Sequence, residues 1–99
     1  MHSSFEWDDT KAASNLRKHG IAFGDALNVF VDPFVLTTQD RTEGGEQRWQ
    51  TLGLVGGCLV LLVAHTVGAN DDDGTEIIRI ISARKADRKE RARYENQNR

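Results

Sequence analysis

The sequence predicts a single α+β domain, in which a mostly antiparallel sheet of four to five strands packs with two N-terminal helices and a short C-terminal helix. Two observations carry this prediction. Helix-type spacing of apolar residues is confined to the first third of the chain, and a helix-start signal reappears only near its end. Between them lie short β-branched or apolar runs separated by turn-forming residues, which is typical of hairpin-connected strands. Strands and helices segregated in this way indicate α+β, in the order β-α-α-β-β-β-β-α.

The N-terminal segment predicts a short strand followed by a helix. Phe5-Glu6-Trp7 alternates apolar and polar residues, as a half-buried strand does. Residues 8–10 can each cap a helix, and residues 11–18 follow with helical spacing. Gly20 supplies a stop signal just past His19.

The second helix is predicted over residues 23–30, where four apolar residues recur at i, i+3, i+4 and i+7. It ends at Asp32, because a residue before proline disfavours the α region. Strands are then expected at residues 34–38, 49–55, 58–66 and 77–84, with a polar loop over residues 39–46. The last two strands are apolar on both faces, so we expect them in the centre of the sheet.

The C-terminal helix has a clear start signal, since Asp87 and Glu90 have the spacing of a capping box. We expect the domain to span residues 1–95 and residues 96–99 to form a disordered tail. His2 is expected in a frayed N-terminus.

The charges are distributed unevenly along the chain. The formal net charge is −2, but residues 79–99 hold eight Lys or Arg against three Asp or Glu, whereas residues 1–78 hold five against twelve. The basic segment 79–93 therefore predicts an anion-binding surface. Besides an enzyme acting on a polyanion, it allows a non-catalytic nucleic-acid-binding module, or a protein-interaction module that docks on an acidic partner.

Several classes of site are not expected. The single cysteine, Cys58, excludes an internal disulfide, and its apolar neighbours predict a buried, inert thiol. The acidic triplet 71–73 has the composition of a solvated turn, and no other metal-ligand spacing is visible, so we expect no metal and no cofactor. The longest apolar run is too short to span a membrane, and no secretory signal precedes Phe5, so we expect a cytoplasmic protein.

Four segments together resemble the BrnT family of toxins from bacterial type II toxin–antitoxin systems. They occur in the family's order: Phe5-Glu6-Trp7-Asp8; Asn15-Leu16-Arg17-Lys18-His19-Gly20 with Phe23; Gly45-Glu46-Gln47-Arg48-Trp49 with Leu52-Gly53; and residues 78–86 with Glu90 and Tyr94. The resemblance implies a RelE-like fold and a ribonuclease that arrests translation. It also implies neutralisation by a cognate BrnA-like ribbon-helix-helix antitoxin, through which the complex binds promoter DNA.

Cleavage of RNA without a metal requires activation of the 2′-oxygen, stabilisation of the phosphorane charge and protonation of the leaving 5′-oxygen. Arg79, in the middle of a predicted strand, is the first candidate for phosphate stabilisation, because its guanidinium can bind a phosphate in two places. Arg84 and Arg48 are further phosphate-binding candidates. Either can equally be the structural partner of Glu46 or Glu76.

Proton transfer has three candidates. His19 and Lys18 lie where the first helix ends, and a histidine can act as acid or base near neutral pH. The alternative is that His19 only interacts with the last helix carbonyls. Glu46 can act as a base or orient an arginine.

The remaining candidates are assigned by position. Lys85, Arg88 and Tyr94 are expected to bind nucleic acid, with Tyr94 stacking on a base or, as an equal alternative, packing in the core. His65 is expected to be a buried structural histidine. The aromatic residues assigned to the core are Trp7, Phe23, Phe30 and Trp49.

Overall fold

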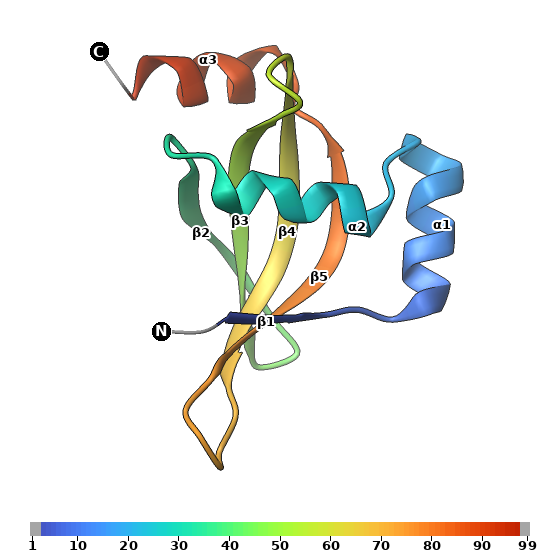
Figure 1. Cartoon of the computed structure of the whole chain (residues 1–99), viewed down its shortest axis with the longest axis vertical. Coiled ribbons are helices and arrows are strands. Elements are labelled where there is room, and N and C mark those ends of the chain that lie inside the picture. Colours follow the sequence, from blue (N-terminus) through green and yellow to red (C-terminus); the bar gives the residue numbers. More distant parts are fainter. Residues whose placement is uncertain (1–2, 98–99) are drawn as a thin grey trace.

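The computed structural model of the chain describes residues 3–97 and contains one five-stranded sheet (Figure 1). In chain order the elements are β1 (Ser3–Glu6), α1 (Asp9–His19), α2 (Phe23–Ala26), the 3-10 helix η1 (Leu27–Val31), β2 (Leu36–Glu43), β3 (Glu46–Val55), β4 (Leu59–Ala69), β5 (Glu76–Lys85) and α3 (Arg88–Asn96). The strand order is β1-β5-β4-β3-β2, and all pairs are antiparallel except β1 with β5. The predicted α+β fold and its order of elements are confirmed.

Two elements differ from the prediction. Residues 39–46 are not a loop, because β2 continues to Glu43 and β3 begins at Glu46, with only a two-residue turn between them. Gly44 and Gly45 adopt φ angles of 60° and 79°, which suit such a turn. The polar residues of this hairpin are mostly exposed, so the ladder extends beyond the core without burying them.

The second helix is α-helical for one turn only and then tightens into η1.

The hydrophobic contacts divide the sheet into two faces. On β4, Leu61 and Val63 pack with α2 and η1, whereas Val60 and Leu62 pack with α3. The alternation of a strand therefore separates two clusters, one under each set of helices. In Figure 1, α2 and η1 cross the middle of the sheet, while α3 lies at the end where β3 turns into β4.

Close packing of η1 on the sheet explains a glycine in β3. A Cβ atom at Gly53 would lie 2.7 Å from both the Cβ atom and the carbonyl oxygen of Val29. No side chain fits there unless η1 moves away. The sequence therefore sets how closely this helix approaches the strands.

Asn15 of α1 completes the outer edge of β5. β1 pairs with β5 only as far as Arg79. Beyond that point the buried Asn15 side chain donates to the Ala83 carbonyl at 2.8 Å and accepts from the Ala83 amide at 3.0 Å. An amide side chain thus replaces a strand partner, and it also donates to the Ile21 carbonyl, which holds the turn after α1.

α3 begins with the predicted capping box, since the Asp87 side chain accepts from the Glu90 amide and Glu90 accepts from the Asp87 amide. The helix extends through Asn96, one residue into the segment expected to be a tail. The Gln97 side chain then donates to the Phe34 carbonyl. Residues 98 and 99, like His2, lie outside the described residues.

Two predictions about single residues have opposite outcomes. Cys58 is exposed in the β3–β4 turn, so the prediction of a buried thiol is wrong. An apolar neighbourhood in sequence did not bury it because the chain turns there.

His65 is buried, bonded to the Thr51 hydroxyl at 2.7 Å and to the Thr66 carbonyl at 3.2 Å, which confirms a structural histidine. Burial is the main cause that lowers the His65 pKa.

The aromatic residues expected in the core mostly pack there. Trp7 and Phe23 meet edge to face, and Phe30 contacts both Phe5 and His65. Trp49 is half-buried on β3. Within residues 3–97, no helix is long and apolar enough to cross a membrane.

Candidate functional site

The face of the sheet that carries α3 is only partly covered. Tyr94 of α3 packs on Leu52 and Leu62 near the β3–β4 turn. Along each strand, every second residue lies on the same face. Moving away from the β3–β4 turn, the residues that follow Leu52 and Leu62 on this face are mostly polar. Together with the matching residues of β2 and β5 they form a surface that we call the polar face: Thr38, Asp40, Arg48, Gln50, Ala64, Thr66, Arg79 and Ser82.

Arg79 lies on the polar face opposite Thr66 of β4, and its other neighbour is Glu6 of β1. The Arg79 Nη1 and Glu6 Oε2 atoms are 3.6 Å apart, and 45% of the Arg79 side chain is exposed. A long contact between two exposed groups contributes little stability. Arg79 is therefore not unpaired, but most of its donors remain available to a ligand.

Arg48 lies on β3, on the same face as Arg79. Its closest carboxylate is Glu43, at 3.9 Å, rather than the Glu46 or Glu76 considered from the sequence. The Arg48 Nε atom is buried without a hydrogen-bond partner, the one such side-chain atom among residues 3–97. An unsatisfied buried donor costs free energy.

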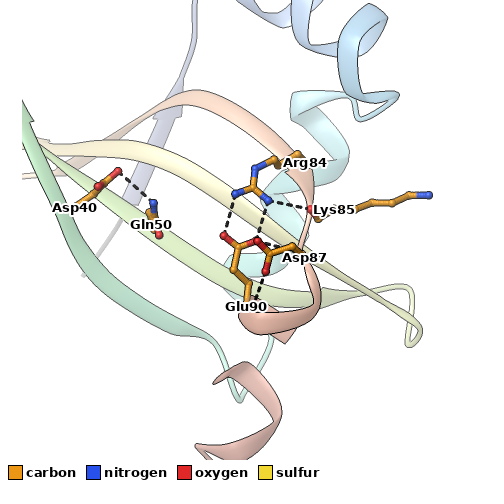
Figure 2. Close-up of polar contacts among 6 residues, drawn as sticks. All are labelled: Asp40, Gln50, Arg84, Lys85, Asp87 and Glu90. Carbon is orange, nitrogen blue, oxygen red and sulfur yellow. Dashed lines mark hydrogen bonds and ion pairs between the residues drawn. The ribbon is translucent and has the colours of Figure 1, made fainter. Parts of the chain in front are cut away.

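Arg84 has a structural role instead. Figure 2 shows its guanidinium facing Glu90, with two hydrogen bonds of 2.8 and 2.9 Å. These bonds raise the Arg84 pKa and are the main cause that lowers the Glu90 pKa. Because Glu90 also caps α3, Arg84 fastens that helix to β5. The prediction that Arg84 pairs with Glu46 or Glu76 is wrong. Its guanidinium already binds the Glu90 carboxylate.

Tyr94 is also part of the fold. It is 7% exposed, and its hydroxyl donates to the Asp32 carboxylate. Burial first, and then this hydrogen bond, raise the Tyr94 pKa to about 12. Tyr94 therefore packs in the core, as one of the two expected alternatives, and its ring has little exposed surface for stacking on a base.

Asp32 connects three parts of the chain and was not recognised from the sequence. Its carboxylate accepts from the Leu54 amide at 2.7 Å, from the Phe34 amide at 3.0 Å and from the Tyr94 hydroxyl. Burial acts to raise the Asp32 pKa, but the three donors outweigh it and lower the pKa overall. This role depends on the segment before β2 lying next to Leu54 of β3, which no local sequence pattern indicates.

Lys18 and His19 lie apart from Arg79, in a pocket of about 180 Å³ between α1 and β5. Along β5, Arg79 is three residues from Ser82, which lines the pocket, or about 10 Å at a rise of roughly 3.3 Å per residue. Glu46 is exposed at the tip of the β2–β3 hairpin. The structure therefore does not bring the four predicted catalytic residues into one contact cluster.

The basic residues after Arg84 are exposed. Lys85 extends away from the Arg84–Glu90 pair in Figure 2, and Arg88 lies in the first turn of α3. Both keep their charge at the surface. Within the described part of the chain, no three His, Cys, Asp or Glu side chains are grouped as a metal site requires.

Sequence reasoning also missed Glu6, Lys11 and Ser82. The seven-residue spacing of Lys11 and Lys18 was a readable sign that both lie on one side of α1. Glu6 becomes a neighbour of Arg79 only through the parallel pairing of β1 with β5, and Ser82 reaches the pocket next to an irregularity in β5.

Comparison with known proteins agrees with this architecture. No curated protein matches the sequence significantly. Among solved structures, the Brucella abortus ribonuclease toxin BrnT aligns with a TM-score of 0.59 and 24% sequence identity, over 89% of this chain and 100% of that one, which establishes the fold. Residues 7–90 match the family described as the ribonuclease toxin, BrnT, of type II toxin-antitoxin systems. The chain therefore belongs to the BrnT family of ribonuclease toxins.

Proposed function

We propose that the protein is a metal-independent endoribonuclease that cleaves RNA on the polar face and so inhibits translation. The observation that carries this proposal is the state of Arg79. It is an arginine in the middle of a strand, with 45% of its side chain exposed and only a 3.6 Å contact to Glu6. A fixed strand positions the guanidinium, while its free donors suit the oxygens of a phosphate.

The chemistry would proceed by attack of the ribose 2′-oxygen on the adjacent phosphorus. A base accepts the 2′-hydroxyl proton as the new O–P bond forms, and the bond from phosphorus to the 5′-oxygen breaks as that oxygen gains a proton. The products are a 2′,3′-cyclic phosphate and a 5′-hydroxyl. Arg79 would stabilise the extra negative charge of the phosphorane, and the partly exposed guanidinium of Arg48 would add positive charge on the same face.

Glu6 is the carboxylate nearest to Arg79 and is our candidate for the base. Substrate phosphate would take over the guanidinium, leaving the Glu6 carboxylate beside the reacting group. Glu46 is a weaker candidate because it lies at the hairpin tip. His19, the acid expected from the sequence, lines the pocket beside α1, apart from Arg79, so we assign protonation of the leaving 5′-oxygen to water.

The decisive experiment measures RNA cleavage by the purified protein in excess chelator. We expect cleavage to persist and to give 2′,3′-cyclic phosphate ends. Arg79→Ala should lower the rate about 10²- to 10³-fold, the usual cost of removing a group that stabilises transition-state charge. Arg41→Ala, which removes an exposed arginine of the β2–β3 hairpin, is the matched control and should cleave normally.

Two results would contradict the proposal. One is an absence of cleavage by soluble, folded protein. The other is activity that disappears in chelator and returns with magnesium. RNA binding without any cleavage would instead favour a non-catalytic nucleic-acid-binding module.

The toxin–antitoxin family also suggests how the activity is controlled. We propose that a ribbon-helix-helix antitoxin of the BrnA type covers the polar face and places carboxylates opposite Arg79, so that the complex binds promoter DNA through the antitoxin and does not bind RNA. In the same experiment, saturating antitoxin should suppress cleavage by the wild-type protein. Suppression without any competition for RNA binding would show that the antitoxin binds elsewhere.

A further inference from the structure

The pocket beside α1 is lined by residues of a single helix face. Positions 11, 14, 15, 18 and 19 of α1 follow the i, i+3, i+4 spacing that aligns side chains along one side of a helix. The lining residues are Lys11, Ser14, Asn15, Lys18 and His19 of α1, with Ile81 and Ser82 of β5. Two ammonium groups, an imidazole and two hydroxyls thus surround the pocket, and its lining contains no carboxylate.

The pocket exists because the outer edge of β5 has a gap in its pairing. β1 accompanies β5 only as far as Arg79, and the Asn15 side chain takes over at Ala83. Between these points the register of β5 with β4 shifts, so that Ile80 and Ser82 have partners on β4 and Ile81 has none. The segment between Arg79 and Ala83 is therefore open toward α1.

The cations of the pocket are available for a ligand. Within residues 3–97, no ion pair involves Lys11, Lys18 or His19. Asp8 lies one helical turn before Lys11, but its carboxylate caps α1 by accepting from the Thr10 and Lys11 amides. Those two bonds first, and the Lys11 charge to a smaller degree, lower the Asp8 pKa.

We propose that this pocket binds one phosphate of the RNA backbone, separate from the phosphate that is cleaved. The proposal rests on RNA being the substrate. The distance of about 10 Å along β5 between Arg79 and Ser82 is larger than the separation of adjacent backbone phosphates, so the pocket holds a phosphate further along the strand than the one at Arg79. The C-terminal end of the α1 dipole opposes an anion, but with about half a charge against two lysines.

In this pocket, Lys18 binds the RNA and takes no part in proton transfer. A phosphate held at a distance from the reacting atoms contributes the same binding free energy in the ground state and in the transition state. Losing it should therefore raise KM and leave kcat nearly unchanged. Loss of a group in the proton transfer would lower kcat instead.

The test measures binding of a 2′-O-methyl RNA oligonucleotide, which cannot be cleaved because its 2′-oxygen is blocked. Its affinity for the wild-type protein and for the Lys11→Gln/Lys18→Gln double variant is determined over a range of salt concentrations. We expect the double variant to bind about tenfold more weakly. The slope of log K against log salt should fall in magnitude by about 0.7, the value for one lost phosphate contact on a single strand.

Arg17→Gln is the matched control, since it removes a cation from the same helix outside the pocket lining. Glutamine and lysine have similar helix propensities, so α1 should persist in both variants, which thermal unfolding verifies. A slope for the double variant equal to that of the Arg17→Gln variant would overturn the proposal. So would a fall in kcat with unchanged KM.

Two further outcomes separate the possible explanations. If an oligoglutamate of equal charge loses more affinity than RNA in the double variant, the pocket takes an acidic protein segment and the proposal is wrong. If the wild-type protein cleaves RNA but the slope does not change, only the pocket assignment fails. If the slope changes but no RNA is ever cleaved, the proposed ribonuclease activity fails while the phosphate subsite stands.

Discussion

Two arginines of one strand, five residues apart, have opposite roles in this protein. Arg84 makes two short hydrogen bonds to Glu90 and fastens α3 to the sheet. Arg79 has a single 3.6 Å contact with Glu6, and nearly half of its side chain is exposed. A basic residue that is fully paired within the fold stabilises it, whereas one that is weakly paired retains its capacity for an external anion.

The same contrast holds for the two ends of the sheet face. At the end covered by α3, Asp32 accepts three hydrogen bonds and satisfies the buried Tyr94 hydroxyl. At the polar face, the Nε donor of Arg48 is buried without a partner. Among residues 3–97, the one buried side-chain donor without a partner therefore lies on the polar face and not at the α3 end.

The largest effect on stability should come from Asp32. Asp32→Ala removes the acceptor of two backbone amides and of a buried hydroxyl, and should lower the free energy of unfolding by about 3 kcal/mol. Chemical denaturation measures this directly. Asp71→Ala, in the exposed β4–β5 loop, is the control and should change the free energy by less than about 0.5 kcal/mol. A similar small change for Asp32→Ala would show that the α3 end is not held by this carboxylate.

A smaller effect should distinguish the two arginines. Arg84→Ala should lower the free energy of unfolding by about 1 to 2 kcal/mol, because it breaks two charge-assisted hydrogen bonds that solvent partly screens. Arg79→Ala should change it by less than about 0.5 kcal/mol while abolishing most of the activity. Equal losses of stability in the two variants would remove the distinction between a structural and a functional arginine.

The smallest effect concerns pH at the α3 end. The Tyr94 pKa is about 12 in the folded protein, above its ordinary value of 10.0, mainly because of burial. A raised pKa stabilises the fold fully below pH 10 and progressively less as the pH rises toward 12. Tyr94→Phe should therefore lose less stability than the wild type between pH 10 and 12. Parallel curves for the two proteins would mean that Tyr94 ionises as freely in the folded state as in the unfolded one.

Local patterns predicted the elements well. Alternation in Phe5–Trp7, the capping-box spacing of Asp87 and Glu90, and the apolar run of β4 depend on nearby residues, and each is confirmed. The exposed thiol of Cys58 and the extended β2–β3 hairpin were misread, because turn geometry decides exposure there.

The candidate site was predictable only in part. The importance of Arg79 followed from a charge in the middle of an apolar strand, and the basic C-terminal segment followed from composition. Which arginine is free, however, depends on contacts between segments far apart in the chain. Glu6 reaches Arg79 through parallel pairing across 73 residues, counted from the registered positions.

The amino-acid sequence alone thus determines the order of the elements, the central strands and the location of positive charge, since these follow from periodicity and composition. The tertiary structure decides which charges are used up in folding. The docking of α3 occupies Arg84 and buries Tyr94, whereas the long contact with Glu6 leaves Arg79 accessible. The edge of β5 beyond Arg79 is accessible because the pairing with β1 ends there. Hydrogen-bond partners are set by register and packing, and no local pattern contains that information.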